Sequence, residues 1–191
     1  RLRTLLIAGT LVAFVLNIFL ISDKAMLPDV FERAVLLRTW VLTPICVLGM
    51  WLISRTPHLL MRELMAISAG LMACVMHVYL SSVSHSPHSA AYLTGLAMVI
   101  VYNNVFVRCR FWLALPSTMS ILLIYLASFW WVENHSPALS ISVGLVLFST
   151  SLFTLYNLYA LEYEERHNYL MALRQRLLQR ELSHANDALE R

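Results

Sequence analysis

The sequence predicts an all-α integral membrane protein: a six-helix bundle with both termini in the cytoplasm, in which helix six continues into a parallel dimeric coiled coil. Three observations lead to this prediction. Of the 191 residues, 59% are hydrophobic and 13% are charged, and that charged fraction is about half of what a soluble domain carries. The apolar residues fall into six long runs. The last run passes into a charged tail with no proline after Pro137 and no glycine after Gly144.

Charge and cysteine content narrow the range of partners. The net charge is +3, and no basic patch alternates with aromatic residues, so we expect no nucleic-acid partner. Cys46, Cys74 and Cys109 show no C-x-x-C spacing and are predicted to be small buried hydrophobes. Because the chain starts at Arg1 rather than methionine and stops within a helical pattern at Arg191, we expect it to be a portion of a longer polypeptide.

The six apolar runs are each close to the roughly 20 residues that a helix needs to cross about 30 Å of hydrocarbon. They occupy residues 4–21, 34–53, 64–83, 91–107, 113–132 and 138–159. Each run is continuously apolar rather than alternating, which favours helices over a membrane barrel. The sequence therefore divides into a transmembrane domain over residues 1–159 and a soluble helix over residues 160–191.

The basic residues indicate the orientation of these spans. Cytoplasmic loops are rich in lysine and arginine. Most of the arginines lie in four segments: the N-terminus, the second loop, the fourth loop and the tail. These four segments fall on one side of the membrane when the six spans cross it in turn. The opposite side has Lys24 and Arg33 in its first loop and no basic residue in its other two. This asymmetry places both termini in the cytoplasm.

The first hairpin contains a cluster of charges at its outer end. Arg38 lies inside the start of the second apolar run, where an unpaired charge is costly. It either reaches the lipid headgroups or forms an ion pair with Asp23 or Asp29 that fixes the hairpin or caps a cavity. Pro44, one or two turns deeper, is predicted to kink the second helix.

Four histidines lie on the predicted outer side: His77 within the third run, and His85, His88 and His135 in the outer loops. Imidazoles with Met76 nearby could ligate a metal ion or haem iron. Alternatively, they line a polar vestibule that responds to pH. A histidine within a membrane span is by default a functional candidate.

Polar side chains also lie inside the apolar runs, among them Tyr92, Asn103 and Asn104. They either join helices by hydrogen bonds or line a pocket for a small amphipathic ligand. We find no G-x-S-x-G, no P-loop and no H-E-x-x-H motif. We also find no internal repeat of the kind that many transporters show. The sequence favours a module that catalyses nothing by itself.

The tail follows a heptad pattern typical of a parallel dimeric coiled coil. One seam runs through Leu161, Asn168, Met171, Leu178, Leu182, Ala185 and Leu189. A second stripe, Leu170, Leu173 and Leu177, competes with it one residue out of phase. Two competing registers could be exchanged by small motions of helix six, as a two-state transmitter requires.

The tail and the spans also resemble a known family. Residues 181–191, Glu-Leu-Ser-His-Ala-Asn-Asp-Ala-Leu-Glu-Arg, resemble the linker helix before GGDEF diguanylate cyclase domains. The spans resemble the six-helix modules of bacterial diguanylate cyclases and of some class III adenylate cyclases. The residues that carry this resemblance are Asp23, Pro28, Arg38, Pro44, Tyr92, Gly95, Arg108, Phe111 and Ala114.

The resemblance implies a membrane sensor in the bacterial inner membrane, with lipid, a second copy of the chain and a small hydrophobic or periplasmic signal as partners. It implies that helix six and the coil control the synthesis of cyclic di-GMP from two GTP. GTP and Mg²⁺ are then expected only in a catalytic domain after Arg191. Alternatives are the input module of an adenylate cyclase or histidine kinase, a haem- or metal-binding membrane sensor, and a small-molecule transporter.

Overall fold

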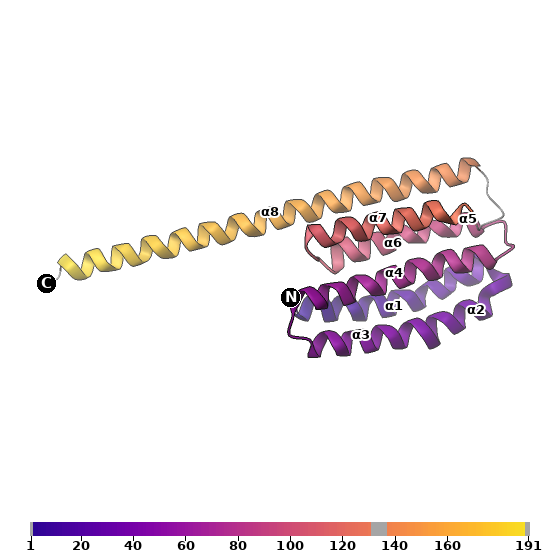
Figure 1. The fold of residues 1–191 in the computed structure, drawn as a ribbon, viewed down its shortest axis with the longest axis horizontal. Helices are drawn as coiled ribbons and strands as arrows, with labels where there is room; N and C mark the ends of the chain where they lie inside the picture. The colour runs from indigo at the N-terminus through magenta and orange to yellow at the C-terminus, as the bar shows by residue number, and fades with distance from the viewer. Residues whose placement is uncertain (1, 131–136, 190–191) are drawn as a thin grey trace.

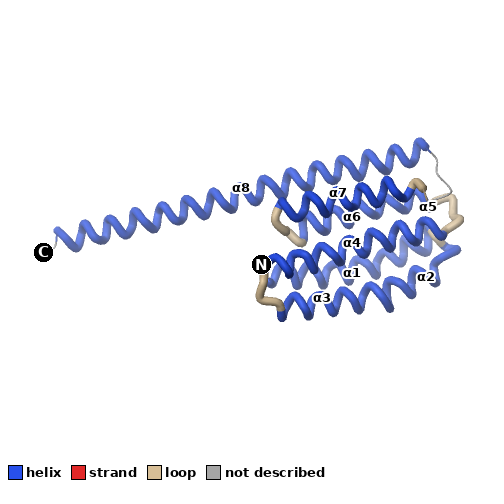
Figure 2. The backbone as a smooth tube through the Cα atoms, in the orientation of Figure 1, coloured by secondary structure: helices blue, strands red, loops and turns tan. Residues whose placement is uncertain are grey.

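The computed structural model describes residues 2–130 and 137–189, and every regular element within these ranges is a helix (Figures 1 and 2). Six helical segments of the described residues are long and apolar enough to cross a membrane. The prediction of an all-α, multi-pass membrane protein is confirmed. Large apolar side chains such as Phe14, Trp40 and Leu123 are exposed around the bundle, which is the surface that a lipid bilayer covers.

The first three spans form one group of helices. α1 (Leu2–Met26) is continuous. The second span is a chain of four elements: η1 (Pro28–Val30), α2 (Phe31–Val35), the π-helical segment η2 (Leu36–Leu42) and α3 (Thr43–Arg55). α4 (Leu59–Val83) is the third. α1 packs on α3, and α3 packs on α4.

The last three spans form a second group. The fourth comprises α5 (Ser89–Tyr92), η3 (Leu93–Gly95), α6 (Leu96–Val101) and the π-helical segment η4 (Tyr102–Phe106). α7 (Phe111–Ser128) and α8 (Pro137–Leu189) follow. α8 packs on α6 and α7, and α4 joins the two groups by packing on both α6 and α7 (Figure 1).

The C-terminal end of α1 differs from the prediction. The sequence places residues 22–33 in a loop, whereas α1 continues through Ser22 and Asp23 to Met26. The side chain of Asp23 is fully buried and is paired, so its charge does not force the helix to end. This extension carries Asp23 into the bundle.

α8 is the longest element, with 53 residues in one unbroken helix. Its first part packs in the bundle, and its second part projects beyond it at the end where the N-terminus of α1 lies (Figure 1). Every side chain from Tyr163 to Arg180 is exposed. Most of this stretch therefore lies outside the packing of the bundle.

Candidate functional site

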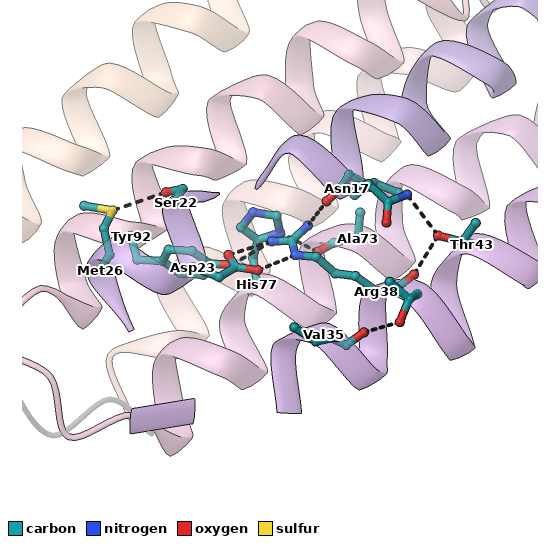
Figure 3. Close-up of polar contacts among 12 residues, drawn as sticks. Asn17, Ser22, Asp23, Met26, Val35, Arg38, Thr43, Ala73, His77 and Tyr92 are labelled. Carbon is teal, nitrogen blue, oxygen red and sulfur yellow. Dashed lines mark hydrogen bonds and ion pairs between the residues drawn. The ribbon is translucent and has the colours of Figure 1, made fainter. Parts of the chain in front are cut away.

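The most polar part of the bundle interior is centred on Arg38. Its Nε donates to Asp23 Oδ2 at 2.5 Å, and its Nη2 donates to Asp23 Oδ1 at 3.0 Å (Figure 3). The Nη1 atom donates to the backbone oxygen of Leu16 at 3.2 Å. Both charged side chains are fully buried. The headgroup alternative for Arg38 is therefore wrong, and the ion pair with Asp23 is confirmed.

Tyr92 extends the pair to the fourth span. Its hydroxyl donates to Asp23 Oδ1 at 2.7 Å and accepts from Arg38 Nη2 at 2.8 Å. The three side chains thus form a closed ring of hydrogen bonds between α1, η2 and α5. Such closure matters because a buried ion pair stabilises a fold only when its remaining hydrogen-bonding capacity is satisfied.

His77 brings α4 into the same cluster. Its imidazole stacks on the Tyr92 ring, with centroids 5.1 Å apart and planes at 19°. The edge of Phe19 meets it at 5.5 Å, and Phe19 also lies 5.5 Å from the Arg38 guanidinium carbon. We call Phe19, Asp23, Arg38, His77 and Tyr92 the polar cluster. It joins the first four spans (Figure 3).

The backbone that carries Arg38 departs from a regular α-helix. Pro44 has no N–H to donate to the carbonyl four residues earlier. Just before it, the Thr43 N–H and hydroxyl both bond to the Arg38 carbonyl, five residues back. The sequence predicts a kink at Pro44; the structure has the π-helical segment η2 at this place, and such segments are frequent at functional sites.

The second candidate partner of Arg38 has another role. Asp29 accepts from the Ser84 hydroxyl at 2.7 Å and from the backbone N–H of His85 at 2.8 Å. The Ser86 hydroxyl donates to the Met26 carbonyl at 2.6 Å. These bonds fasten the loop after α4 to η1 and to the last residue of α1.

The predicted histidine site separates into parts. His77 is buried, whereas His85 and His88 are exposed in the loop after α4. Met76 lines a different cavity from His77, and His135 lies outside the described residues. Within residues 2–130 and 137–189, no three histidine, cysteine, aspartate or glutamate side chains come together as a metal site would require.

The buried asparagines join helices by hydrogen bonds, which is one of the two alternatives that the sequence left open. Asn103 donates to Ser117 of α7 at 3.2 Å. Asn104 donates to Thr118 of α7 at 3.1 Å and to Thr154 of α8 at 2.9 Å. η4 is therefore the polar link between the fourth span and the last two.

A second polar region lies where α8 leaves the bundle. A cleft of about 260 Å³ is lined by charged side chains, including Glu63, Arg108, Arg110, Glu162 and Glu165. Glu162 Oε2 accepts from the backbone N–H of Phe111, the first residue of α7, at 3.0 Å. A carboxylate at this helix end is favourable because of the positive end of the helix dipole.

Cys109 is buried beside that cleft. Burial raises the pKa of its thiol to about 12, and the negative charges of Glu63 and Glu162 act in the same direction. Its role as a small buried hydrophobe is confirmed, as it is for Cys46 and Cys74, which are also buried.

Sequence reasoning selected Arg38, His77 and Tyr92 as candidates, and the structure brings these three together. It did not select Phe19, although Phe19 lies four residues before Asp23 and therefore on the same face of α1. Nor did it assign a role to Gly95, where a Cβ atom would lie 3.0 Å from His77 Nε2. That contact depends on packing between separate spans.

Comparisons with known proteins do not place the chain in a family. No family model, curated protein or solved structure matches it. Its function is therefore argued from the geometry above.

Proposed function

We propose that this chain is the membrane input and dimerisation portion of a bacterial signalling protein. In this proposal, α8 carries a change in the bundle to a catalytic domain that follows Arg191. The supporting observation is α8 itself, a single helix that packs in the bundle over its first part and has exposed side chains throughout Tyr163 to Arg180. A helix without a break transmits a displacement of its packed part to its free part.

Three polar contacts set the position of α8 against the bundle. Near its start, the Ser140 carbonyl accepts from the Tyr125 hydroxyl at 2.7 Å. In the middle, Thr154 accepts from Asn104. At the exit from the bundle, Glu162 binds the first residue of α7. A change at any of these contacts alters how the free part of α8 is presented.

The free part of α8 exposes apolar side chains that a second copy of the chain would cover. Leu170, Leu177, Leu178 and Leu182 are each at least half exposed. They belong to the two competing heptad stripes of the sequence, which favour a parallel two-stranded coil. We propose a homodimer held by this coil, with the termini in the cytoplasm and the bundle in the inner membrane.

The proposed output is cyclic di-GMP. The resemblance of residues 181–191 to the linker before GGDEF domains supports it. Diguanylate cyclase domains react as pairs, so the reaction rate depends on how two domains are placed relative to each other. A coil with two registers would supply that control. An adenylate cyclase or histidine kinase would use the same geometry, and product analysis of the full-length protein with GTP or ATP and Mg²⁺ separates these outputs.

Disulfide cross-linking in membranes tests the dimer. The background has Cys46, Cys74 and Cys109 replaced by alanine. In it, Leu178→Cys should cross-link two copies that pair through the first seam. Leu177→Cys should cross-link two copies that pair through the competing stripe. Arg176→Cys is the control, because it lies about 160° around the helix from Leu178. If neither leucine position cross-links more than Arg176→Cys, the dimer is wrong.

Transmission is tested in the same experiment. Glu162→Ala removes the contact with α7 and should change the ratio of Leu177→Cys to Leu178→Cys cross-linking by about threefold or more, as expected for a shift of roughly 0.7 kcal/mol between two registers. Tyr169→Ala serves as the control, because Tyr169 is exposed on the same helix and lies in neither leucine stripe. An unchanged ratio in Glu162→Ala would show that the bundle does not set the coil.

A further inference from the structure

An apolar pocket of about 180 Å³ lies between α1, α4 and the fourth span. Its walls are aliphatic and aromatic over nearly their whole extent, with Leu16, Phe19 and Val99 among them. Met98 and Phe106, which also line it, are 52% and 42% exposed on the outside of the bundle. The pocket therefore opens toward the lipid rather than toward either aqueous end.

Among the described residues that line this pocket, His77 has a buried side-chain polar atom without a hydrogen-bond partner. His77 is 1% exposed, and its Nε2 atom has no hydrogen-bond partner among the described residues. A Cβ atom at Gly95 would lie 3.0 Å from Nε2, and both residues line the pocket. The Nε2 edge of the imidazole therefore packs closely against Gly95 at the wall of the pocket.

The opposite ring nitrogen fixes what Nε2 can do. Nδ1 lies 2.9 Å from the Ala73 carbonyl oxygen. Because a carbonyl only accepts hydrogen bonds, Nδ1 carries the hydrogen, and Nε2 of the neutral ring is an acceptor. A buried acceptor without a donor is unfavourable, and no donor among the described residues pairs with Nε2.

We propose that this pocket binds a small, neutral, apolar molecule that carries one hydroxyl group, with the hydroxyl donating to His77 Nε2. Its size follows from the volume, because a cavity of about 150 Å³ holds a benzene ring. A carboxylate would set its lone pairs against that of Nε2, and an ammonium would bring an uncompensated charge into an apolar site. A phenol or an alcohol of similar size meets each of these requirements.

A second apolar cavity of the bundle provides the contrast. It lies between the second and third spans, is lined by Leu37, Val41, Leu71 and Val75, and measures about 510 Å³. No buried polar atom lacking a partner belongs to its lining in the part of the chain that the structure describes. It therefore lacks the unpaired buried acceptor that His77 supplies in the first pocket.

The pocket is mechanically connected to the polar cluster. His77 stacks on Tyr92, whose hydroxyl bonds to both Asp23 and Arg38. A ligand on Nε2 therefore contacts a ring that helps to hold the first four spans together. The proposal deepens the proposed function, and its meaning as a signal input rests on that function, whereas binding itself does not.

Fluorine NMR of the purified protein in detergent tests binding with two probes of equal shape. 4-Fluorophenol has the hydroxyl, and 4-fluorotoluene has a methyl group in its place. We expect saturable binding of 4-fluorophenol that is about tenfold tighter than that of 4-fluorotoluene, because only the phenol pairs Nε2. Equal affinities, or no saturable binding of the phenol, would overturn the proposal.

Variants locate the binding site. His77→Leu should reduce the preference for the phenol to about threefold or less, because the acceptor is gone. Gly95→Ala covers Nε2 with a methyl group and should weaken phenol binding about tenfold, which provides a second test if His77→Leu does not fold. Val75→Phe narrows the second cavity and should leave both affinities unchanged. A preference that survives in His77→Leu or Gly95→Ala, or is lost in Val75→Phe, would overturn the assignment.

Cross-linking at Leu178→Cys separates the two proposals. Saturable phenol binding without coil cross-linking would support the pocket and contradict the signalling module. Cross-linking without phenol binding would support the signalling module and contradict the pocket. A change in cross-linking yield on addition of 4-fluorophenol, absent with 4-fluorotoluene, would support both.

Discussion

Arg38 and Asp23 lie in different spans and form a two-bond ion pair with both side chains fully buried. Separating these charges would leave one of them unpaired in a low-dielectric interior, which is the most unfavourable arrangement for either group. The Tyr92 hydroxyl bonds to both partners and so satisfies part of the hydrogen-bonding capacity that the ion pair alone leaves unused. The pair therefore fixes how the first hairpin meets the fourth span.

This geometry predicts strong coupling between the two charges. Arg38→Ala or Asp23→Ala should each destabilise the bundle by about 3–5 kcal/mol, because the other charge stays buried without its partner. Replacing both, as Asp23→Leu with Arg38→Met, should cost at least about 2 kcal/mol less than the sum of the single changes. Unfolding by sodium dodecyl sulfate in mixed micelles measures these differences.

Arg55→Ala is the matched control for that cycle. Arg55 is exposed and lies 5.8 Å from the Trp51 ring centroid, so its loss should cost less than about 1 kcal/mol. Additive single-variant effects at Asp23 and Arg38 would contradict the ion pair as a stabilising unit.

Gly70 predicts a second stability effect. A Cβ atom at this position would overlap the Asn103 carboxamide, with Nδ2 at 2.8 Å, and Asn103 is held in place by Ser117. Gly70→Ala should therefore destabilise the bundle by about 1–3 kcal/mol, because a packed interior does not accept an additional methyl group. The same unfolding assay measures the change.

Gly49 is the control for that substitution. A Cβ atom there would meet nothing within 4 Å, and alanine favours a helix over glycine by up to about 1 kcal/mol. Gly49→Ala should thus be neutral or stabilising. Equal effects at both glycines would rule out close packing as the reason for Gly70.

Cys109 predicts a dependence on pH. Burial raises the pKa of its thiol to about 12, so the reactive thiolate is scarce until the pH approaches that value. N-ethylmaleimide labelling of Cys109, followed by mass spectrometry with Cys46 and Cys74 replaced by alanine, should stay at least about 100-fold slower than labelling of an exposed thiol at neutral pH. The stability associated with the neutral thiol is fully present below the ordinary thiol pKa and is lost as the pH rises toward 12.

Arg176→Cys supplies the exposed thiol for comparison, because Arg176 is exposed on the free part of α8 and lies off both leucine stripes. Its labelling rate should rise with pH up to the ordinary thiol pKa of about 8.5 and then level off. Equal rates at Cys109 and at Arg176→Cys would show that the turn between η4 and α7 opens readily.

The number and approximate place of the spans could be predicted because length and apolar composition decide them. The polar cluster could be predicted only in part. A charge within an apolar run identified Arg38, but the choice between headgroup and ion pair depended on whether α1 extends far enough to bring Asp23 alongside. The helix end at Met26, two residues before Pro28, agrees with the local sequence, but burial of Asp23 within α1 depends on its pairing with Arg38.

The contacts between distant spans could not be predicted from local pattern. Phe19, His77 and Gly95 come from three different spans, and no spacing relates them. The π-helical segments η2 and η4 have no compositional signature either, beyond Pro44 after the first of them. The seam of the coil stays a prediction. The structure holds a single chain, in which α8 is exposed from Tyr163 to Arg180. The side chains of Ala185 and Leu189 lie outside the described part.

The continuity of α8 restricts how its two leucine stripes can be exchanged. Leu177 and Leu178 are adjacent, so replacing one by the other at a fixed contact requires a rotation of about 100° about the helix axis. A regular helix does not absorb such a twist between Ser140 and Leu178, and therefore its membrane half must turn as well. That turn would break the Tyr125–Ser140 and Asn104–Thr154 hydrogen bonds. These two bonds therefore hold the membrane half of α8 against rotation about its own axis.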